Sequence, residues 1–212
     1  LAAARDDFAT ALARYDEAIA GADEPPSTLI AKRFTAMRET GREAEGVRDL
    51  RAWLDDHPED GLIQAFVAEL DLRGGDYDAA VANYEALLER APNNVTVLNN
   101  LAWLYGESGR GAEGVALARR ALEVAPDSPA VQDTLGWLLV GTGDADEAVP
   151  LLEQAARAVP NDPEIAYHLA AALAEAGEAR RARSALQDLL REQGAFASRD
   201  DAEALLRRLE GG

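Results

Sequence analysis

Residues 95–128 decide the fold, and they read VTVLNNLAWLYGESGRGAEGVALARRALEVAPDS. Leu101 and Tyr105 are four residues apart, as on one face of a helix. Gly109 stands where this helix must end and the chain reverse, because glycine tolerates the left-handed backbone of such an end. A second apolar stripe follows, and Pro126 ends it because proline cannot continue an internal hydrogen-bond ladder. The stretch therefore predicts two helices joined by a tight turn.

The same pattern recurs along the chain every 34 residues. One set of markers is the glycine of the turn, found at Gly41, Gly75, Gly109, Gly143 and Gly177. An independent set is the proline that ends the second helix, found at Pro58, Pro92, Pro126 and Pro160. Small residues also recur where helices must approach closely, at Ala68, Ala102, Gly136 and Ala170 on first helices and at Ala80, Gly114, Ala148 and Ala182 on second helices. One helical pair cannot bury its own apolar stripes, whereas stacked pairs can, so the sequence predicts an all-α solenoid.

This repeat resembles the tetratricopeptide repeat (TPR) family, whose pattern has a large apolar residue followed by Gly or Ala, then Tyr, Ala and a closing Pro. The matching residues are Leu101-Ala102, Tyr105 and Pro126 in one unit, Leu135-Gly136, Ala148, Ala155 and Pro160 in the next, Leu169-Ala170, Ala182 and Leu186 in the third, and Ala80, Tyr84 and Pro92 in the unit before them. The resemblance implies a right-handed α-solenoid of helix-turn-helix repeats with a capping helix at its end.

The register predicts how the segments of one continuous domain follow each other. Residues 1–26 look like the second helix of a truncated repeat, which indicates a longer array upstream of this fragment. Residues 197–212 are expected to form a capping helix that begins with a capping box, Ser198 and the acid Asp201 three residues later. Its apolar face consists of Ala202, Leu205, Leu206 and Leu209. The five TPR units between these ends are 27–60, 61–94, 95–128, 129–162 and 163–196.

Two of these units depart from the pattern. Arg33-Phe34 replaces the usual Leu-Gly or Leu-Ala of the unit 27–60, so we expect looser helix packing there. Asp71 occupies the usual Tyr position of the unit 61–94. The pattern is cleanest over residues 95–162, where we expect the most regular repeats.

Composition excludes several classes of partner. The net charge is −18 over 212 residues, with 39 acidic and 21 basic side chains. Binding to nucleic acid through its phosphates is therefore not expected, nor is adsorption to an anionic membrane. The sequence lacks any run of eighteen apolar residues, so we expect no direct membrane insertion of this fragment. It has no cysteine, which rules out disulfides, thiol nucleophiles and thiolate metal sites.

The sequence shows no constellation of residues that would carry a reaction. Its two histidines, His57 and His168, lie in units with three repeats between them, too far along a solenoid to act together. The sequence contains no phosphate-binding loop, nucleophile elbow or zinc motif. We therefore expect no catalytic, cofactor or metal site, and predict that the chain is not an enzyme.

The remaining candidate is the concave surface that first helices line in TPR arrays. Positions two, five, six, nine and twelve of each unit are expected to face it. The candidate partner-binding residues on these positions are Thr96, Asn99, Asn100, Trp103, Asp133, Trp137, Glu164, Tyr167 and His168. Trp103 and Trp137 are 34 residues apart and should lie at one height on adjacent helices. Either they form an aromatic floor for a ligand, or they pack between the helices as core, since tryptophan is usually largely buried.

Several partners fit such a surface. Asn99 and Asn100 could bind the backbone of an extended peptide or the hydroxyl groups of a sugar. Asp133 and Glu164 would favour a cationic partner. TPR arrays that clamp a peptide carboxylate need cations in this groove, and Ala65, Ala130 and Thr134 stand at those places instead. The first hypothesis is thus a scaffold that binds a protein or peptide, with a polysaccharide as the further candidate partner.

A narrower resemblance concerns the segments LNNLAWLYGESG, DTLGWLLVGTGDADEAVPLLEQA, YHLAAALAEAG and DAEALLRRL. They look like the C-terminal array of bacterial TPR lipoproteins of exopolysaccharide and PEP-CTERM protein-sorting systems. This resemblance implies a periplasmic or outer-envelope protein that is lipid-anchored upstream of the fragment, with a cytoplasmic location as the alternative. It also raises a second hypothesis, a structural spacer without a discrete ligand.

Overall fold

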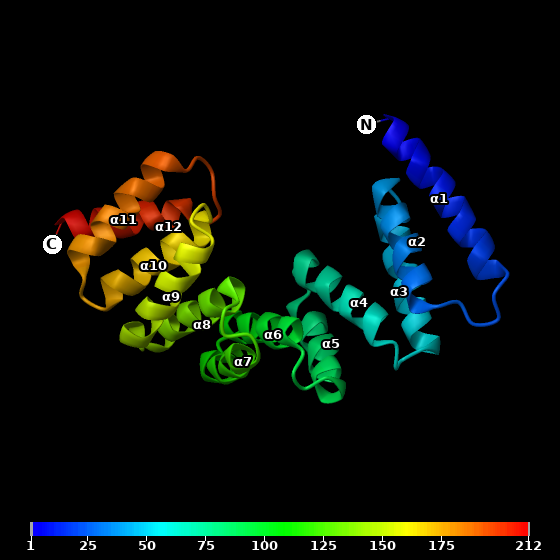
Figure 1. The fold of residues 1–212 in the computed structure, drawn as a ribbon, viewed down its shortest axis with the longest axis horizontal. Coiled ribbons are helices and arrows are strands. Elements are labelled where there is room, and N and C mark those ends of the chain that lie inside the picture. Colours follow the sequence, from blue (N-terminus) through cyan, green and yellow to red (C-terminus); the bar gives the residue numbers. More distant parts are fainter. Residues whose placement is uncertain (1, 212) are drawn as a thin grey trace. The chain divides into compact units, whose positions relative to one another are not determined.

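The structure is a computed structural model that describes residues 2–211, with side chains from residue 7 onward. The described residues form twelve helices and no strand, which confirms the predicted all-α repeat fold (Figure 1). Leu1 and Gly212, which belong to the predicted end segments, lie outside the described residues. The chain divides into two compact units, Leu1–Arg90 and Ala91–Gly212. That its segments make up one continuous domain stays a prediction.

The first unit contains five helices, drawn in blue to green in Figure 1: α1 (Ala2–Ala20), α2 (Ser27–Glu39), α3 (Glu43–Asp56), α4 (Gly61–Gly74) and α5 (Tyr77–Arg90). Each helix packs on the next, and α2 also contacts α4. Its core is built from Phe34, Leu50, Ile63 and Val67, all at most 2% exposed. Each helical pair therefore buries its apolar faces against the neighbouring pair, as a repeat protein requires.

The second unit contains seven helices: α6 (Val95–Glu107), α7 (Gly111–Val124), α8 (Pro129–Thr142), α9 (Ala145–Ala158), α10 (Pro163–Glu175), α11 (Ala179–Glu192) and α12 (Arg199–Gly211). The first helices α6, α8 and α10 contact one another in sequence, while α7 packs on α6 and α8, and α9 on α8 and α10. Helix α12 packs against α10 and α11, with Ala202 fully buried and Leu205 8% exposed. The first helices of this unit thus form one layer that carries the candidate surface.

The turn glycines have the backbone conformation that the sequence predicted. Gly41, Gly75, Gly109, Gly143 and Gly177 have φ between 77° and 92°. In the turn at Gly109, its amide donates to the Gly106 carbonyl at 3.1 Å and the Arg110 amide donates to the Tyr105 carbonyl at 2.7 Å. These two bonds satisfy carbonyls at the end of α6 in the Schellman arrangement. A residue with a side chain would be strained at each of these five positions.

The recurring small residues allow the paired helices to approach closely. A methyl group added at Gly114 would lie 2.7 Å from the carbonyl oxygen of Ala102. One added at Gly136 would lie 2.5 Å from the Leu152 side chain. Both distances are shorter than van der Waals contact, so these glycines let neighbouring helices pack at a separation that alanine would prevent.

Helices α2 and α3 contact each other less extensively than the paired helices of the other repeats, which confirms the looser packing expected in the unit 27–60. Phe34 is 2% exposed, and a methyl group added at Gly46 would lie 2.8 Å from its ring. The large side chain on α2 is thus accommodated by the absence of a side chain on α3. The repeat pattern did not identify this glycine as the partner of Phe34.

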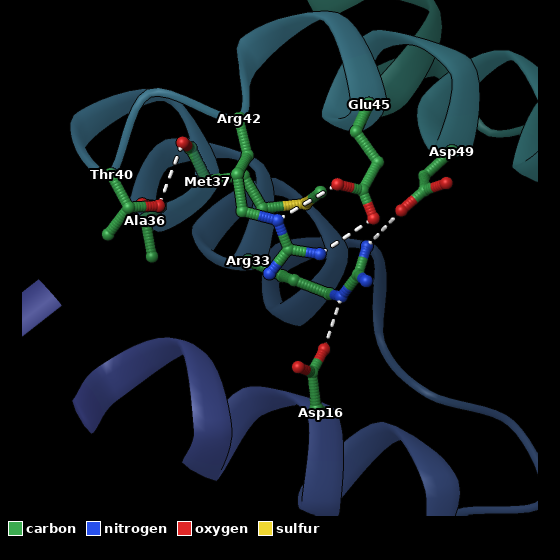
Figure 2. A network of polar contacts seen from close by, with 8 residues as sticks. All are labelled: Asp16, Arg33, Ala36, Met37, Thr40, Arg42, Glu45 and Asp49. Atoms are coloured by element: carbon green, nitrogen blue, oxygen red, sulfur yellow. Dashed lines mark hydrogen bonds and ion pairs between the residues drawn. The ribbon is translucent and has the colours of Figure 1, made fainter. Parts of the chain in front are cut away.

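Arg33, beside Phe34, forms an ion-pair bridge across three helices (Figure 2). Its Nε contacts Asp16 of α1 at 2.6 Å, and its Nη1 contacts Asp49 of α3 at 2.5 Å. One repeat later the same position holds Val67, which is 2% exposed. A charged residue therefore stands at an apolar position of the repeat because two carboxylates from flanking helices receive it.

Asp71 is a second polar residue at a position that the pattern reserves for another type. Its side chain is 1% exposed, forms an ion pair with Arg51 of α3 and accepts a hydrogen bond from Asn83 of α5 at 3.0 Å. Burial raises the pKa of this carboxyl, against the attraction of Arg51 and the hydrogen bond from Asn83. Polar contacts to α3 and α5 thus replace the contacts expected of a tyrosine.

Candidate functional site

All nine candidate residues lie on the first helices of the second unit. Thr96 is exposed near the start of α6, and Asn99, Asn100 and Trp103 of the same helix are partly buried. The others are also partly buried, with Asp133 and Trp137 on α8 and Glu164, Tyr167 and His168 on α10. We call the surface formed by these residues and the hollows next to them the groove.

Four of the candidates are brought together around Trp137. The imidazole of His168 stacks on the Trp137 indole with ring centroids 4.2 Å apart and planes inclined by 19°. The Tyr167 ring lies 5.9 Å from both of these rings. Nδ1 of His168 is 2.8 Å from Oδ1 of Asp133, so an ionised Asp133 accepts a hydrogen bond from Nδ1–H. This cluster joins α8 to α10 and fixes the orientation of the imidazole.

Trp137 combines the two roles that the sequence left open. It packs against a buried cluster that includes Ala170, Ala171 and Leu205. It also lines two hollows, one between α6 and α8 and one beside α10 and α12. Trp103 lines the first of these hollows as well. The tryptophan side chains thus belong partly to the packing of the layer and partly to its surface.

The tryptophan hollow, between α6 and α8, has a volume of about 460 Å³. Its lining includes Trp103, Gly106, Glu107, Trp137, Leu138 and Gly141. Three further small residues complete one wall, Gly109 of the turn and Gly111 and Ala112 at the start of α7. Among the described residues of the lining only Glu107 is charged, so the hollow offers aromatic and backbone surface with one carboxylate.

The C-terminal hollow, of about 350 Å³, lies on the other side of Trp137. Its lining includes Trp137, Tyr167, Glu175, Asp201, Leu205 and Arg208. Arg208 pairs with Glu175 at 3.0 Å. Burial and the nearby Asp201 carboxylate raise the pKa of the Tyr167 hydroxyl. This hollow has a net negative lining and, unlike the tryptophan hollow, receives residues from the last helix.

Asn99 contributes a polar atom that lacks a partner. Its Oδ1 is buried, and it is the only buried side-chain nitrogen or oxygen in the described part of the chain that forms no hydrogen bond. An unsatisfied buried acceptor of this kind costs about 1–3 kcal/mol. The amide stands one helical turn before Trp103 on the groove side of α6.

Glu164 has a structural partner that the sequence did not indicate. Its carboxylate accepts hydrogen bonds from the Ala197 amide at 2.7 Å, the Ser198 amide at 3.3 Å and the Ser198 hydroxyl at 2.6 Å. The predicted capping box is therefore wrong, because the amide and hydroxyl of Ser198 bond to Glu164 instead of to Asp201. Glu164 anchors the segment that leads into α12.

Sequence reasoning missed the hollow residues outside the chosen repeat positions. Glu107 and Glu175 are 68 residues apart, two repeats, and each follows a groove position by four residues. That helical spacing could have identified both residues as neighbours of the groove. Asp201 and Arg208 lie on α12, outside the 34-residue register, and no sequence pattern assigned them to the groove.

Neither a metal-binding cluster nor a membrane-spanning helix is found in the described part of the chain. Among the side chains of residues 7–211, no three from His, Asp or Glu gather in a way that could hold a metal ion. Among the same residues, every helix is too short or too polar to cross a membrane.

Solved structures with a similar fold include several TPR proteins. A TPR protein from Parabacteroides merdae ATCC 43184 has 18% identity and a TM-score of 0.77, over 99% of this chain and 82% of that one. TTC0263, a thermophilic TPR protein of Thermus thermophilus, has 19% identity and a TM-score of 0.61, over 87% and 99%. YrrB, a TPR protein with an unusual peptide-binding site, has 20% identity and a TM-score of 0.61, over 76% and 82%.

These likenesses, at 18–20% identity, show the fold. No curated protein matches the sequence. The sequence profile of the tetratricopeptide repeat family matches residues 71–138 and 139–209, which together are more than half of the chain. The chain belongs to the tetratricopeptide repeat family.

Proposed function

We propose that this chain is a non-enzymatic scaffold that binds a protein or peptide segment in the groove of its second unit. The observation that carries the proposal is the position of Trp137, held by His168 and Tyr167 between two hollows. TPR domains bind proteins or peptides, and YrrB, which shares this fold, has a peptide-binding site. Aromatic anchors beside pockets are the usual centres of binding energy in protein interfaces.

The hollows suit a segment of protein in an extended conformation. They lie in a row along α6, α8 and α10, with Trp137 lining both. Side chains of an extended segment could enter the hollows while its backbone crosses Trp137. The Asn99 amide, which has an unsatisfied acceptor, offers a hydrogen-bonding group to that backbone if its side chain rotates.

The test begins with capture of partners from the native organism on the immobilised 212-residue chain. The affinity of a captured partner is then measured by calorimetry for the wild type, Trp103→Ala and Trp137→Ala. We expect each variant to weaken binding by about tenfold or more, as for a residue that contributes at least 1.4 kcal/mol. Circular dichroism and thermal unfolding show whether each variant is folded.

Trp53→Ala is the matched control, because Trp53 lies in the first unit and its indole nitrogen donates to Asp60 at 2.7 Å. It should leave the affinity unchanged. Wild-type affinity in a folded variant that lacks both groove tryptophans would contradict the proposal and favour a spacer without a discrete ligand.

We further propose, on the resemblance in residues 95–212, that the chain belongs to a lipid-anchored envelope protein of an exopolysaccharide or protein-sorting system. Detection of the intact protein in the membrane fraction, and its release by removal of the lipid, would support that location. Direct polysaccharide contact is the second candidate function, because the half-buried Trp137 and Tyr167 rings can stack on sugar rings. Affinity electrophoresis in gels that contain the organism's exopolysaccharide distinguishes a polysaccharide ligand from a peptide ligand. Retardation of the chain that depends on Trp137 favours the polysaccharide.

A further inference from the structure

We infer that the occupant of the groove is a basic, extended peptide segment that places one Arg or Lys side chain in the tryptophan hollow and another in the C-terminal hollow. The inference rests on the proposed function and specifies its ligand. It depends on the charges that line the two hollows, on their aromatic walls and on the distance between them.

Each hollow contains one carboxylate that the protein itself does not use. In the part of the chain with described side chains, Glu107 and Asp201 form no ion pair or hydrogen bond through their carboxylates, and both are exposed. The other acidic groups of the groove are engaged, Asp133 by His168, Glu164 by Ser198 and Glu175 by Arg208. Glu107 and Asp201 are therefore the groups available to a cation from outside.

The walls of the hollows suit the remainder of an Arg or Lys side chain. Such side chains lay their methylene stems on apolar surface while the charged head stays near water. Trp103, Leu138 and Trp137 offer that surface beside Glu107. Trp137, Tyr167 and Leu205 offer it beside Asp201. A cation above an indole or phenol ring also gains from the negative face of the ring.

The spacing of the hollows selects an extended segment. The tryptophan hollow lies between α6 and α8, and the C-terminal hollow lies one helix further along the layer. Packed helices are about 8–10 Å apart. A chain in the extended polyproline II conformation rises about 3.1 Å per residue and makes one turn in three residues, so side chains three positions apart point to the same side. Two basic residues three positions apart therefore fit the two hollows.

The same charges exclude other ligands of the groove. Among its described lining residues, the tryptophan hollow has no cation to receive an acidic peptide or a terminal carboxylate. In the C-terminal hollow the cation Arg208 already pairs with Glu175. A neutral peptide or a sugar would leave Glu107 and Asp201 partly desolvated without a partner, which is unfavourable.

The test uses the 212-residue chain and fluorescein-labelled serine–glycine peptides, followed by fluorescence anisotropy at low salt. One peptide carries two arginines three positions apart, a second carries glutamines at the same places, and a third carries the two arginines side by side. We expect the first to bind at least fivefold more tightly than either of the others. Its affinity should fall as salt is added, because exposed charges are screened.

Substitutions in the protein locate the two contacts. Glu107→Gln and Asp201→Asn should each lower the affinity for the first peptide by about two- to fivefold, as for exposed ion pairs. Asp200→Asn and Glu123→Gln are the matched controls, since both residues are exposed and neither lines a hollow. They change the net charge equally and should leave the affinity unchanged.

The inference is overturned if the glutamine peptide or a neutral oligosaccharide binds as tightly as the first peptide, or if the controls weaken binding as much as the hollow variants. Self-association of the chain without peptide binding would overturn it too. A captured partner whose affinity depends on Trp103 and Trp137, but not on Glu107 and Asp201, would overturn the basic ligand and leave the proposed function intact.

Discussion

The imidazole of His168 on α10 lies almost parallel to the indole of Trp137 on α8, with centroids 4.2 Å apart. A second stack of the same kind, Trp53 with His57 at 3.8 Å, occurs in the first unit. There both residues lie within four positions, at the end of α3. The Trp137 stack instead joins two repeats and is fixed by Asp133. It therefore couples the shape of the groove to the packing of its first helices.

We expect His168→Ala to uncover one face of Trp137 and shift its fluorescence emission to longer wavelength. The measurement needs a background with Trp53→Phe and Trp103→Phe, so that Trp137 alone emits. An aromatic stack contributes about 0.5–1.5 kcal/mol, and stability should fall by a similar amount. His57→Ala, which removes the other stack, is the control and should leave this emission unchanged. An unshifted spectrum for His168→Ala would show that the stack does not persist in solution.

Two glycines of α8 should respond in opposite ways to alanine. Gly136→Ala places a methyl group 2.5 Å from the Leu152 side chain and should cost about 1–3 kcal/mol through overpacking. Gly141→Ala meets no atom within 4 Å and should stabilise the helix by about 0.5–1 kcal/mol. Urea unfolding of both variants gives the comparison. A stabilising Gly136→Ala would contradict the close approach of α8 and α9.

Asp71 should make the first unit relatively more stable as the pH falls. Burial raises the pKa of its carboxyl in the folded state, so folding binds a proton there more tightly than the unfolded chain does. The unfolding free energy of the wild type, relative to Asp71→Asn, should therefore rise as the pH falls through that folded pKa toward the lower pKa of the carboxyl in the unfolded chain. Asp78→Asn, an exposed acid of α5, should show no such difference. Parallel pH profiles for the wild type and Asp71→Asn would refute the prediction.

Several of the predicted features that the structure confirms depend on backbone chemistry. The five glycines adopt positive φ because the turn needs a conformation that only glycine takes without strain. A repeat pattern gives the position of each residue within its unit, but not the side chain that packs against it from the neighbouring helix. The pattern therefore did not predict that Phe34 packs against Gly46.

The same limit applies to the candidate site. Repeat positions placed Trp137 and His168 on one surface, but whether Trp137 is core or groove depends on side-chain packing. The structure gives it both contacts. The bond from Ser198 to Glu164 joins residues 34 positions apart, and local capping rules consider only neighbours in sequence. Asp201 enters the groove through the docking of α12, which has no counterpart in the repeat.

Glu164→Ala should loosen the start of α12. The variant removes the acceptor of three hydrogen bonds from Ala197 and Ser198, and loss of a helix cap costs about 0.5–2 kcal/mol. Hydrogen exchange of the first-turn amides of α12 should accelerate, while exchange in α6 stays as in the wild type. Glu164→Gln retains one acceptor oxygen, so the exchange rate of these amides should lie between those of the wild type and of Glu164→Ala. Unchanged exchange in Glu164→Ala would show that packing alone holds the helix.

The bridge at Arg33 allows the cost of a charge at an apolar repeat position to be measured (Figure 2). The Arg33 side chain is 22% exposed, whereas Asp16 and Asp49 are 47% and 43% exposed. Arg33→Leu keeps apolar contact at this position and leaves two carboxylates that water can solvate. We therefore expect a loss of only about 0.5–2 kcal/mol, the sum of two partly exposed ion pairs.

Arg33→Ala should cost more than Arg33→Leu, because it also removes the packing of the side-chain stem. Salt separates the two contributions. High ionic strength should reduce the stability of the wild type relative to Arg33→Leu, since screening weakens the pairs with Asp16 and Asp49. The difference between the leucine and alanine variants depends on packing and should not change with salt. If Arg33→Leu lost several kcal/mol at every salt concentration, the bridge would be a strong buried interaction, and the exposure of its two carboxylates would not describe the protein in solution.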